Sequence, residues 1–194
     1  LQEAPITRIV PTGIETEASR YGVDVIVFAT GFDAMTGPLL RMNISGRNGL
    51  ALKDKWADGP RSYLGLQVSG FPNMFTITGP GSPSVLTNMP TSIEQHVEWV
   101  CDCIDHLRRR GQTRIEPSVE AEEAWVDHVA EMSNLGLFNR ANSWYLGANI
   151  PGKKRVFMPY VGGFANYRAR CGEIAANGYE GFRLSSGSGV GEQR

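Results

Sequence analysis

The chain has 194 residues, a net charge of −1 at pH 7, 41% apolar residues and 20% charged residues. These values fit one sizeable soluble domain or two small ones, and they supply no general attraction for nucleic acid or an anionic membrane. No apolar run approaches the roughly 20 residues that would span a bilayer, and three scattered cysteines without a visible signal peptide favour a reducing, cytoplasmic setting. Because the sequence starts at Leu1 rather than Met and is strand-like at once, we expect it to be part of a longer polypeptide.

The amino-terminal part predicts a small meander followed by a buried strand. Residues 6–10 alternate apolar and polar, Pro11-Thr12-Gly13 forms a turn, and residues 14–16 resume the strand pattern. Residues 25–28 are an unbroken run of Val, Ile, Val and Phe, which is typical of a strand covered on both faces in the middle of a parallel sheet. In open α/β sheets, ligands bind beyond the carboxyl ends of the strands. We therefore predict that residues 29–33 face a ligand.

A second strand, a loop and the clearest helix of the chain follow. Residues 74–78 predict another buried strand, and the Gly/Pro/Ser-rich residues 79–84 predict a loop after it. Residues 91–94 have capping-box spacing, so the helix is expected to begin there and to end at Gly111. Its expected apolar stripe consists of Ile93, Val97, Val100, Ile104 and Leu107.

The carboxyl-terminal part alternates short strands, helices and one irregular stretch. We expect strands over 113–116, 155–160 and 179–184, a helix beginning at Pro117-Ser118, and a helix over 166–176. The second helix should bury Ala121, Trp125, Val129 and Met132. Residues 135–163 are irregular and glycine-rich, and the Ser/Gly-rich residues from 185 onward predict a disordered tail.

The strand–loop–helix unit of residues 74–111 is the best place for chemistry, because helix amino termini attract anions. Two ligands fit such a terminus: a pyrophosphate, or the pyrimidine edge of a flavin. The pyrophosphate is disfavoured because the third glycine of the fingerprint is missing and because Pro80, Pro83 and Pro90 remove N–H donors. A proline-stiffened loop with no ligand remains the structural alternative. The isolated histidines, and the Cys101–Cys103 pair without a second ligand pair, do not indicate a base or a zinc site.

Three segments together carry a family resemblance. They are Ala-Thr-Gly-Phe-Asp at 29–33, Gly-Pro-Gly-Ser-Pro-Ser through Asn-Met and Ile-Glu-Gln-His at 79–96, and Ser-Trp-Tyr-Leu-Gly-Ala-Asn-Ile-Pro-Gly-Lys at 143–153. The sequence from about residue 6 to residue 184 resembles the carboxyl-terminal portion of type I Baeyer–Villiger monooxygenases, which are class B flavoprotein monooxygenases.

The resemblance implies an α/β fold that is part of a flavoprotein with two Rossmann-like dinucleotide-binding domains. Residues 1–22 would end the NADP-binding domain, residues 23–184 would form the carboxyl-terminal part of the FAD-binding domain with a mobile loop at about 136–156, and residues 185–194 would be a disordered tail. Since no complete Gly-x-Gly-x-x-Gly fingerprint is present, the resemblance implies that the catalytic residues lie upstream. The chain would then be incomplete, and inactive, without an amino-terminal portion.

The resemblance also implies site residues, cofactors and a reaction. The cofactors would be FAD and NADP, bound by Ala29, Thr30, Gly31, Phe32, Asp33, Ser84, Asn88, Met89 and Trp144. The backbone at Asn88 and Met89 would lie against the flavin, and Trp144 would reach NADP. The substrate pocket would be lined by Val85, Leu86, Met89 and Met158. One oxygen atom of O₂ would be inserted next to the carbonyl of a small-molecule ketone, giving an ester or lactone. Hydroxylation of nitrogen or sulfur, and a non-catalytic interaction module, remain the alternatives.

Overall fold

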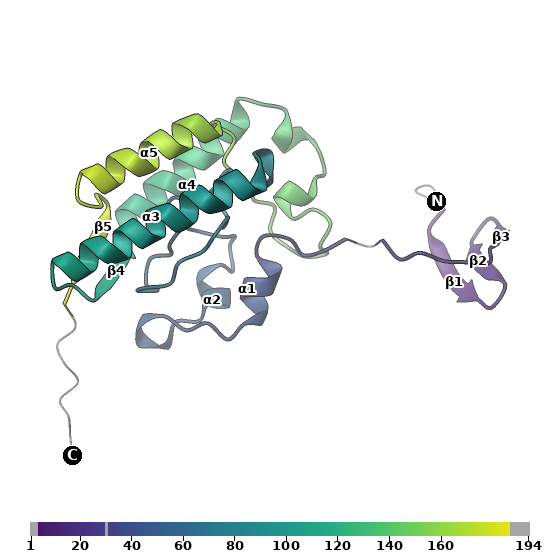
Figure 1. The fold of residues 1–194 in the computed structure, drawn as a ribbon. Coiled ribbons are helices and arrows are strands. Elements are labelled where there is room, and N and C mark those ends of the chain that lie inside the picture. Colours follow the sequence, from purple (N-terminus) through teal and green to yellow (C-terminus); the bar gives the residue numbers. More distant parts are fainter. Residues whose placement is uncertain (1–3, 30, 187–194) are drawn as a thin grey trace, which may run out of the picture. The chain divides into compact units, whose positions relative to one another are not determined.

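The computed structural model describes residues 4–29 and 31–186, and it divides into one unit that ends at Phe32 and a second that begins at Asp33 (Figure 1). The first unit contains an antiparallel sheet of β1 (Ile6–Val10), β2 (Gly13–Thr16) and β3 (Arg20–Gly22), in that order. Gly13 pairs with Gly22 and has a positive φ, and a Cβ atom there would lie 1.9 Å from the carbonyl oxygen of Tyr21. Only glycine fits that position. The predicted meander is confirmed.

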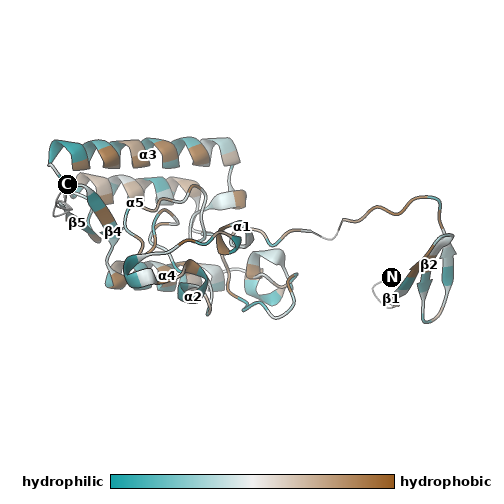
Figure 2. Cartoon of the chain, turned by 90° about the horizontal axis from the view of Figure 1, so that it is seen from below, coloured by the Kyte–Doolittle hydropathy of each residue, from teal (hydrophilic) through white to brown (hydrophobic). Residues whose placement is uncertain are grey.

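The strand predicted over residues 25–28 is wrong for this chain. Residues 24–29 form no regular structure, and Val25, Val27 and Phe28 are 75%, 82% and 70% exposed. Figure 2 shows this apolar stretch after the small sheet. A strand that is apolar on both faces requires neighbouring strands and covering side chains, and no strand within residues 4–29 and 31–186 pairs with it.

The second unit is built from three long helices and a short sheet. The helices are α3 (Met89–Arg109), α4 (Val119–Asn134) and α5 (Phe164–Ala176), and the antiparallel pair is β4 (Arg114–Pro117) with β5 (Phe182–Ser185) (Figure 1). Two short helices, α1 (Gly37–Arg41) and α2 (Leu52–Lys55), precede them. Four single turns of 3₁₀ helix complete the regular structure of the described residues: η1 (Arg47–Gly49), η2 (Ser84–Leu86), η3 (Phe138–Arg140) and η4 (Trp144–Leu146). The predicted helix beginning at Ser118 is confirmed, because the Ser118 side chain accepts a hydrogen bond from the N–H of Ala121 at 3.1 Å.

The core of the second unit lies between the long helices and the loops of residues 60–82. Its largest cluster includes Trp99, Trp125, Tyr160 and Tyr167 together with Leu64, Leu66, Ile115 and Ile174. A smaller cluster of Leu52, Trp56, Val68 and Phe71 lies under α1 and α2. Most buried apolar side chains therefore pack between helices and loops, and not against a wide sheet.

Two other predicted strands are also wrong. Residues 74–78 form only an isolated bridge between Phe75 and Gln67, and residues 155–160 are irregular. Their backbone groups are nevertheless used: the Thr76 N–H donates to the Leu66 carbonyl at 2.8 Å, and the Tyr160 N–H donates to the Ser82 carbonyl at 2.7 Å. These scattered partners lie in loops, so no ladder forms.

Helix α3 begins earlier than predicted and buries a different face. Its N-cap is Asn88 rather than Thr91, and Pro90 lies in the first turn, where a missing N–H costs nothing. The buried residues are Ser92, Gln95, His96, Trp99, Cys103 and Leu107. Of the expected apolar stripe, Ile93, Val97 and Ile104 are exposed. Among the described residues, no helix is both long and apolar enough to cross a membrane.

Candidate cofactor-binding site

The loop before α3 places two backbone donors at the positive end of a long helix. Asn88 caps α3 by accepting a hydrogen bond from the Thr91 N–H at 3.2 Å. The N–H groups of Asn88 and Met89 have no acceptor within the residues that the structure describes. The 21 residues of α3 add the partial positive charge of its amino terminus. This donor set fits the edge of a flavin, which carries carbonyl oxygens and becomes negative on reduction. The roles of Asn88 and Met89 stay predictions.

The turn before these donors is strained and firmly held. Ser84 begins η2 with a φ of +46°, in the left-handed region, although it is not glycine. Its side chain is buried, and its Oγ lies 3.3 Å from the sulfur of Met35. Non-glycine residues in this region cost about 1–3 kcal/mol and persist where the surroundings fix them. The strain therefore indicates that the surrounding structure fixes the conformation of residues 84–88.

A buried histidine connects α3 to the loop at Thr78 and to α5. The Thr78 N–H donates to Nδ1 of His96 at 2.9 Å, and Nε2 of His96 lies 2.9 Å from the hydroxyl of Tyr167. Tyr167 in turn donates to the Leu64 carbonyl at 2.7 Å. Burial lowers the pKa of His96 to about 4. His96 is therefore a neutral structural group that joins α3, α5 and the loop, as the sequence favoured, and not a base.

Asp33, predicted to contact the cofactor, is paired with the glycine-rich loop, and its cofactor contact stays a prediction. Its carboxylate forms an ion pair with Nζ of Lys153, which also donates to the hydroxyl of Thr36 at 2.6 Å. The side chains of Asp33 and Lys153 are 27% and 17% exposed. The pairing connects the last residue of the 143–153 motif to the last residue of the 29–33 motif. Sequence reasoning missed it, because a single lysine after Pro-Gly gives no signal of its distant partner.

The remaining predicted residues of the 29–33 motif belong to the first unit, whose placement relative to the second is not determined. Ala29 and Phe32 are exposed, and Gly31 has a φ of +80°. Thr30 lies outside the described residues. Their cofactor contacts stay predictions.

Trp144 stands at the start of η4 and is 37% exposed. Its ring lies against Tyr145 with a centroid distance of 4.3 Å, and Ser143 caps the turn by accepting from the Tyr145 N–H at 3.2 Å. Within the described part of the chain, the indole N–H has no acceptor. An exposed aromatic surface with an unused donor is suited to cover a flat polar ligand.

The four predicted substrate-lining residues do not meet in one described cavity. Val85 is exposed, Leu86 and Met89 are half-buried, and Met158 is fully covered. Met158 lines a cavity of about 430 Å³ that none of the other three lines. Their common role in a pocket stays a prediction. No group of three or more metal-ligating side chains occurs among the described residues.

Comparison with known proteins identifies the relatives of this chain. No protein-family model matches it. It is 48% identical over 187 residues to acetone monooxygenase (methyl acetate-forming) of Gordonia sp. (strain TY-5), covering 95% of this chain and 35% of that protein. It is 43% identical over 176 residues to a Baeyer–Villiger monooxygenase of Pseudooceanicola batsensis, covering 90% of this chain and 32% of that protein. It is 42% identical over 187 residues to phenazine N-monooxygenase of Lysobacter antibioticus, covering 96% and 34%.

The structural comparison agrees with the sequence comparison. The crystal structure of the OTEMO complex with FAD and NADP matches with a TM-score of 0.88 and 40% identity, covering 95% of this chain and 34% of that one. The expected fold class, part of a larger α/β flavoprotein, is confirmed. The chain spans about a third of the length of the relatives it matches. It is thus homologous over nearly its whole length to the Baeyer–Villiger monooxygenases, and it corresponds to about one third of such a protein.

Proposed function

We propose that this chain is the carboxyl-terminal portion of an FAD- and NADPH-dependent monooxygenase that inserts one oxygen atom of O₂ next to a ketone carbonyl and releases an ester or lactone. The observation that carries the proposal is the 43–48% identity to a Baeyer–Villiger monooxygenase and to acetone monooxygenase, which extends over nine-tenths or more of the chain. The two unused backbone donors at Asn88 and Met89 support a flavin at this place.

The amino-terminal portion of the same enzyme would be the required partner. The chain covers about a third of its relatives, and residues 24–29 and one side of α3 expose apolar side chains that a larger protein would cover. All three cysteines are free thiols, which fits a reducing compartment such as the cytoplasm.

Each part of the chain would have a distinct task. When bound, reduced flavin supplies the activation of O₂, and NADPH supplies the electrons. The amino terminus of α3 would hold the flavin edge and favour its negative charge. The loop of residues 136–156 would cover NADP and exclude water, with Trp144 donating its indole N–H to the cofactor. Its attachment through Lys153 to Asp33 would set the position of that cover.

One comparison favours a second reaction, hydroxylation of nitrogen. The identity to phenazine N-monooxygenase, 42% over 187 residues, is close to that of the ketone-oxidising relatives and includes the same region. Hydroxylation of an aromatic nitrogen is therefore the alternative, and the chain's own residues do not separate the two reactions.

The experiment uses the complete protein, purified after addition of FAD, together with NADPH, ¹⁸O₂ and two substrates, cyclohexanone and phenazine. We expect an ester oxygen labelled from O₂ with cyclohexanone and no labelled N-oxide with phenazine. The reverse result would establish the alternative, and the absence of a flavin absorption spectrum would contradict both reactions.

Trp144→Ala should raise the KM for NADPH at least about fivefold, as expected for the loss of about 1 kcal/mol of binding. The matched change Phe138→Ala, in the same loop, should leave the KM unchanged. An unchanged KM in Trp144→Ala would remove the assigned role of that residue.

A further inference from the structure

The loop of residues 79–82, which leads toward the backbone donors of Asn88 and Met89, is held by its own carbonyl groups. Each of its four carbonyl oxygens accepts a hydrogen bond. The donors are Oγ of Ser82 to Gly79 at 2.7 Å, Oγ of Ser62 to Pro80, the indole N–H of Trp125 to Gly81 at 3.0 Å and the N–H of Tyr160 to Ser82 at 2.7 Å. Because every carbonyl of the loop is paired within the protein, the path of the loop is fixed.

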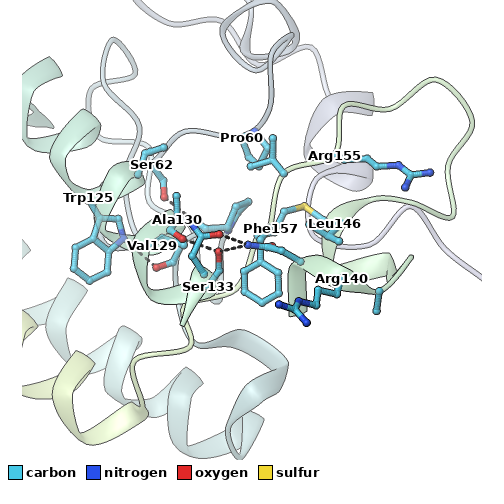
Figure 3. A pocket seen from close by; sticks show the side chains of 18 of the residues that line it. Pro60, Ser62, Trp125, Val129, Ala130, Ser133, Arg140, Leu146, Arg155 and Phe157 are labelled. Atoms are coloured by element: carbon cyan, nitrogen blue, oxygen red, sulfur yellow. Dashed lines mark hydrogen bonds between the residues drawn. The ribbon is translucent and has the colours of Figure 1, made fainter. Parts of the chain in front are cut away.

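Two of these donors are buried side chains that both approach Gly81. Ser62 and Trp125 are 3% and 5% exposed, and both line the cavity of about 430 Å³ at Met158. Figure 3 shows them on the same side of that cavity. Gly81 has a φ of +90°, and a Cβ atom there would lie 2.9 Å from Oγ of Ser62 and 3.2 Å from Nε1 of Trp125. The two side chains therefore reach the backbone at this point because the residue there is glycine.

The segment between this loop and the two donors has little freedom of its own. Pro83 is buried and its ring restricts its φ, and Ser84 is held in the left-handed region. The Leu86 N–H donates to the Pro83 carbonyl at 3.0 Å. The Thr87 N–H donates to the Ser84 carbonyl at 3.3 Å, and Asn88 then caps α3. A displacement of the loop of residues 79–82 is therefore passed on to the donors and is not absorbed between them.

We propose that Trp125 is a positioning residue, which holds the Gly81 carbonyl and thereby sets the place of the two backbone donors at the flavin edge. Trp125 contacts no part of the cofactor in this role, and Ser62 supports it at the neighbouring carbonyl. Hydrogen bonds weaken steeply outside their normal distance and angle, and those to a charged group are about twice as strong as neutral ones. Correctly placed donors should therefore favour the negative, reduced flavin over the oxidised flavin. The inference rests on the proposed function, which assigns the flavin to this place.

The test compares the reduction potential of the bound flavin in the complete protein and in its Trp125→Phe variant, by anaerobic titration against a reference dye. Phenylalanine keeps an aromatic ring beside Tyr160 and removes the indole N–H. We expect the potential to become more negative by about 30 mV, which corresponds to an about tenfold weaker preference for the two-electron-reduced flavin. Ser62→Ala, which removes the second side-chain donor, should shift the potential in the same direction. In the FAD-free protein, hydrogen exchange of residues 79–89 should be at least about threefold faster in both variants.

Trp99→Phe is the matched control. Trp99 is also 5% exposed, and its indole N–H donates at 3.0 Å to the carbonyl of Cys171 in α5 and not to the loop. This variant should leave the potential unchanged, and an equal shift in it would overturn the proposal by showing a general disturbance of the core. An unchanged potential in Trp125→Phe, even with faster exchange, would show a purely structural role and would also overturn it. If Trp125→Phe does not fold, Ser62→Ala decides by the same results. A complete protein that binds no flavin would instead overturn the proposed function itself, and this role with it.

Discussion

Residues 24–29 and residues 63–79 have similar apolar sequences but very different surroundings. The first segment has exposed side chains and no regular structure in its own unit. The second segment forms no extended strand either, yet it buries Leu64 and Leu66 completely and uses its backbone through the bridges of Gln67 with Tyr63 and Phe75. The difference lies in the neighbours. The second segment is enclosed by α3, α4 and α5, and the first has no such cover in its unit.

The comparison teaches what an apolar pattern measures. It shows that a segment requires cover, and it does not show which part of a protein provides that cover. The two sides of α3 repeat the lesson within one helix: Trp99 and Cys103 are buried in the core of the second unit, while Ile93 and Val97 are exposed.

The sharpest test of the comparison substitutes one residue from each segment. Leu66→Ala should lower the free energy of unfolding by about 3 kcal/mol, because a fully buried leucine leaves a cavity. Val27→Ala should change it by less than about 0.5 kcal/mol, because this side chain is already in water. Urea denaturation followed by circular dichroism measures both. A loss in Val27→Ala similar to that in Leu66→Ala would show that the first segment is buried after all.

The sequence was sufficient where local rules decide the structure. The meander at residues 6–16, the Ser118 cap, and the helix ended by Asn177 depend on turn chemistry, capping and periodicity, and each was predicted within a few residues. The sequence was insufficient where residues far apart in the chain determine the structure by pairing with each other. The strand predictions at 25–28, 74–78 and 155–160 failed because a ladder needs a neighbour that local sequence does not reveal. The capping-box prediction failed because Asn88 is the stronger competitor for the cap.

The candidate site follows the same division. The motifs indicated residues 84–89 and Trp144, and in the described part of the chain the backbone N–H groups of Asn88 and Met89 and the indole N–H of Trp144 have no acceptor. The ion pair between Asp33 and Lys153 joins residues 120 positions apart, and the role of His96 depends on Tyr167 in another helix. Neither partnership has a signature in a single sequence, since each is created by tertiary packing.

The buried histidine gives a pH-dependent test of how strongly residues 63–79 are enclosed. His96 has a pKa of about 4 in the folded protein, against about 6.5 when it is exposed. The unfolded chain therefore takes up this proton first as the pH falls, and the folded state loses stability between pH 6.5 and pH 4. We expect a loss of about 2 kcal/mol between pH 7 and pH 5 from this group. Burial also lowers the pKa of His106, which adds a loss in the same direction.

His96→Gln separates the two histidines. The variant should be less stable at pH 7, because the Thr78 and Tyr167 contacts are disturbed, and its remaining pH dependence should be the smaller part that His106 contributes. Denaturation curves at pH 7, 6 and 5 measure this difference. An unchanged slope with pH in His96→Gln would mean that His96 does not titrate as a buried neutral group.

The smallest expected effect concerns Asp33, the first residue of the second unit. Lys153→Ala removes the ion pair and leaves the carboxylate of Asp33 half-buried without a cation. Local opening of residues 137–153 should become about fivefold more frequent, which corresponds to about 1 kcal/mol for a pair of this exposure. Hydrogen exchange followed by mass spectrometry measures it peptide by peptide. The neighbouring change Lys154→Ala breaks a solvent-exposed pair with Asp58 and should leave exchange unchanged. Equal exchange in the two variants would mean that the loop is held by its apolar contacts alone, and that the ion pair with Asp33 does not stabilise it.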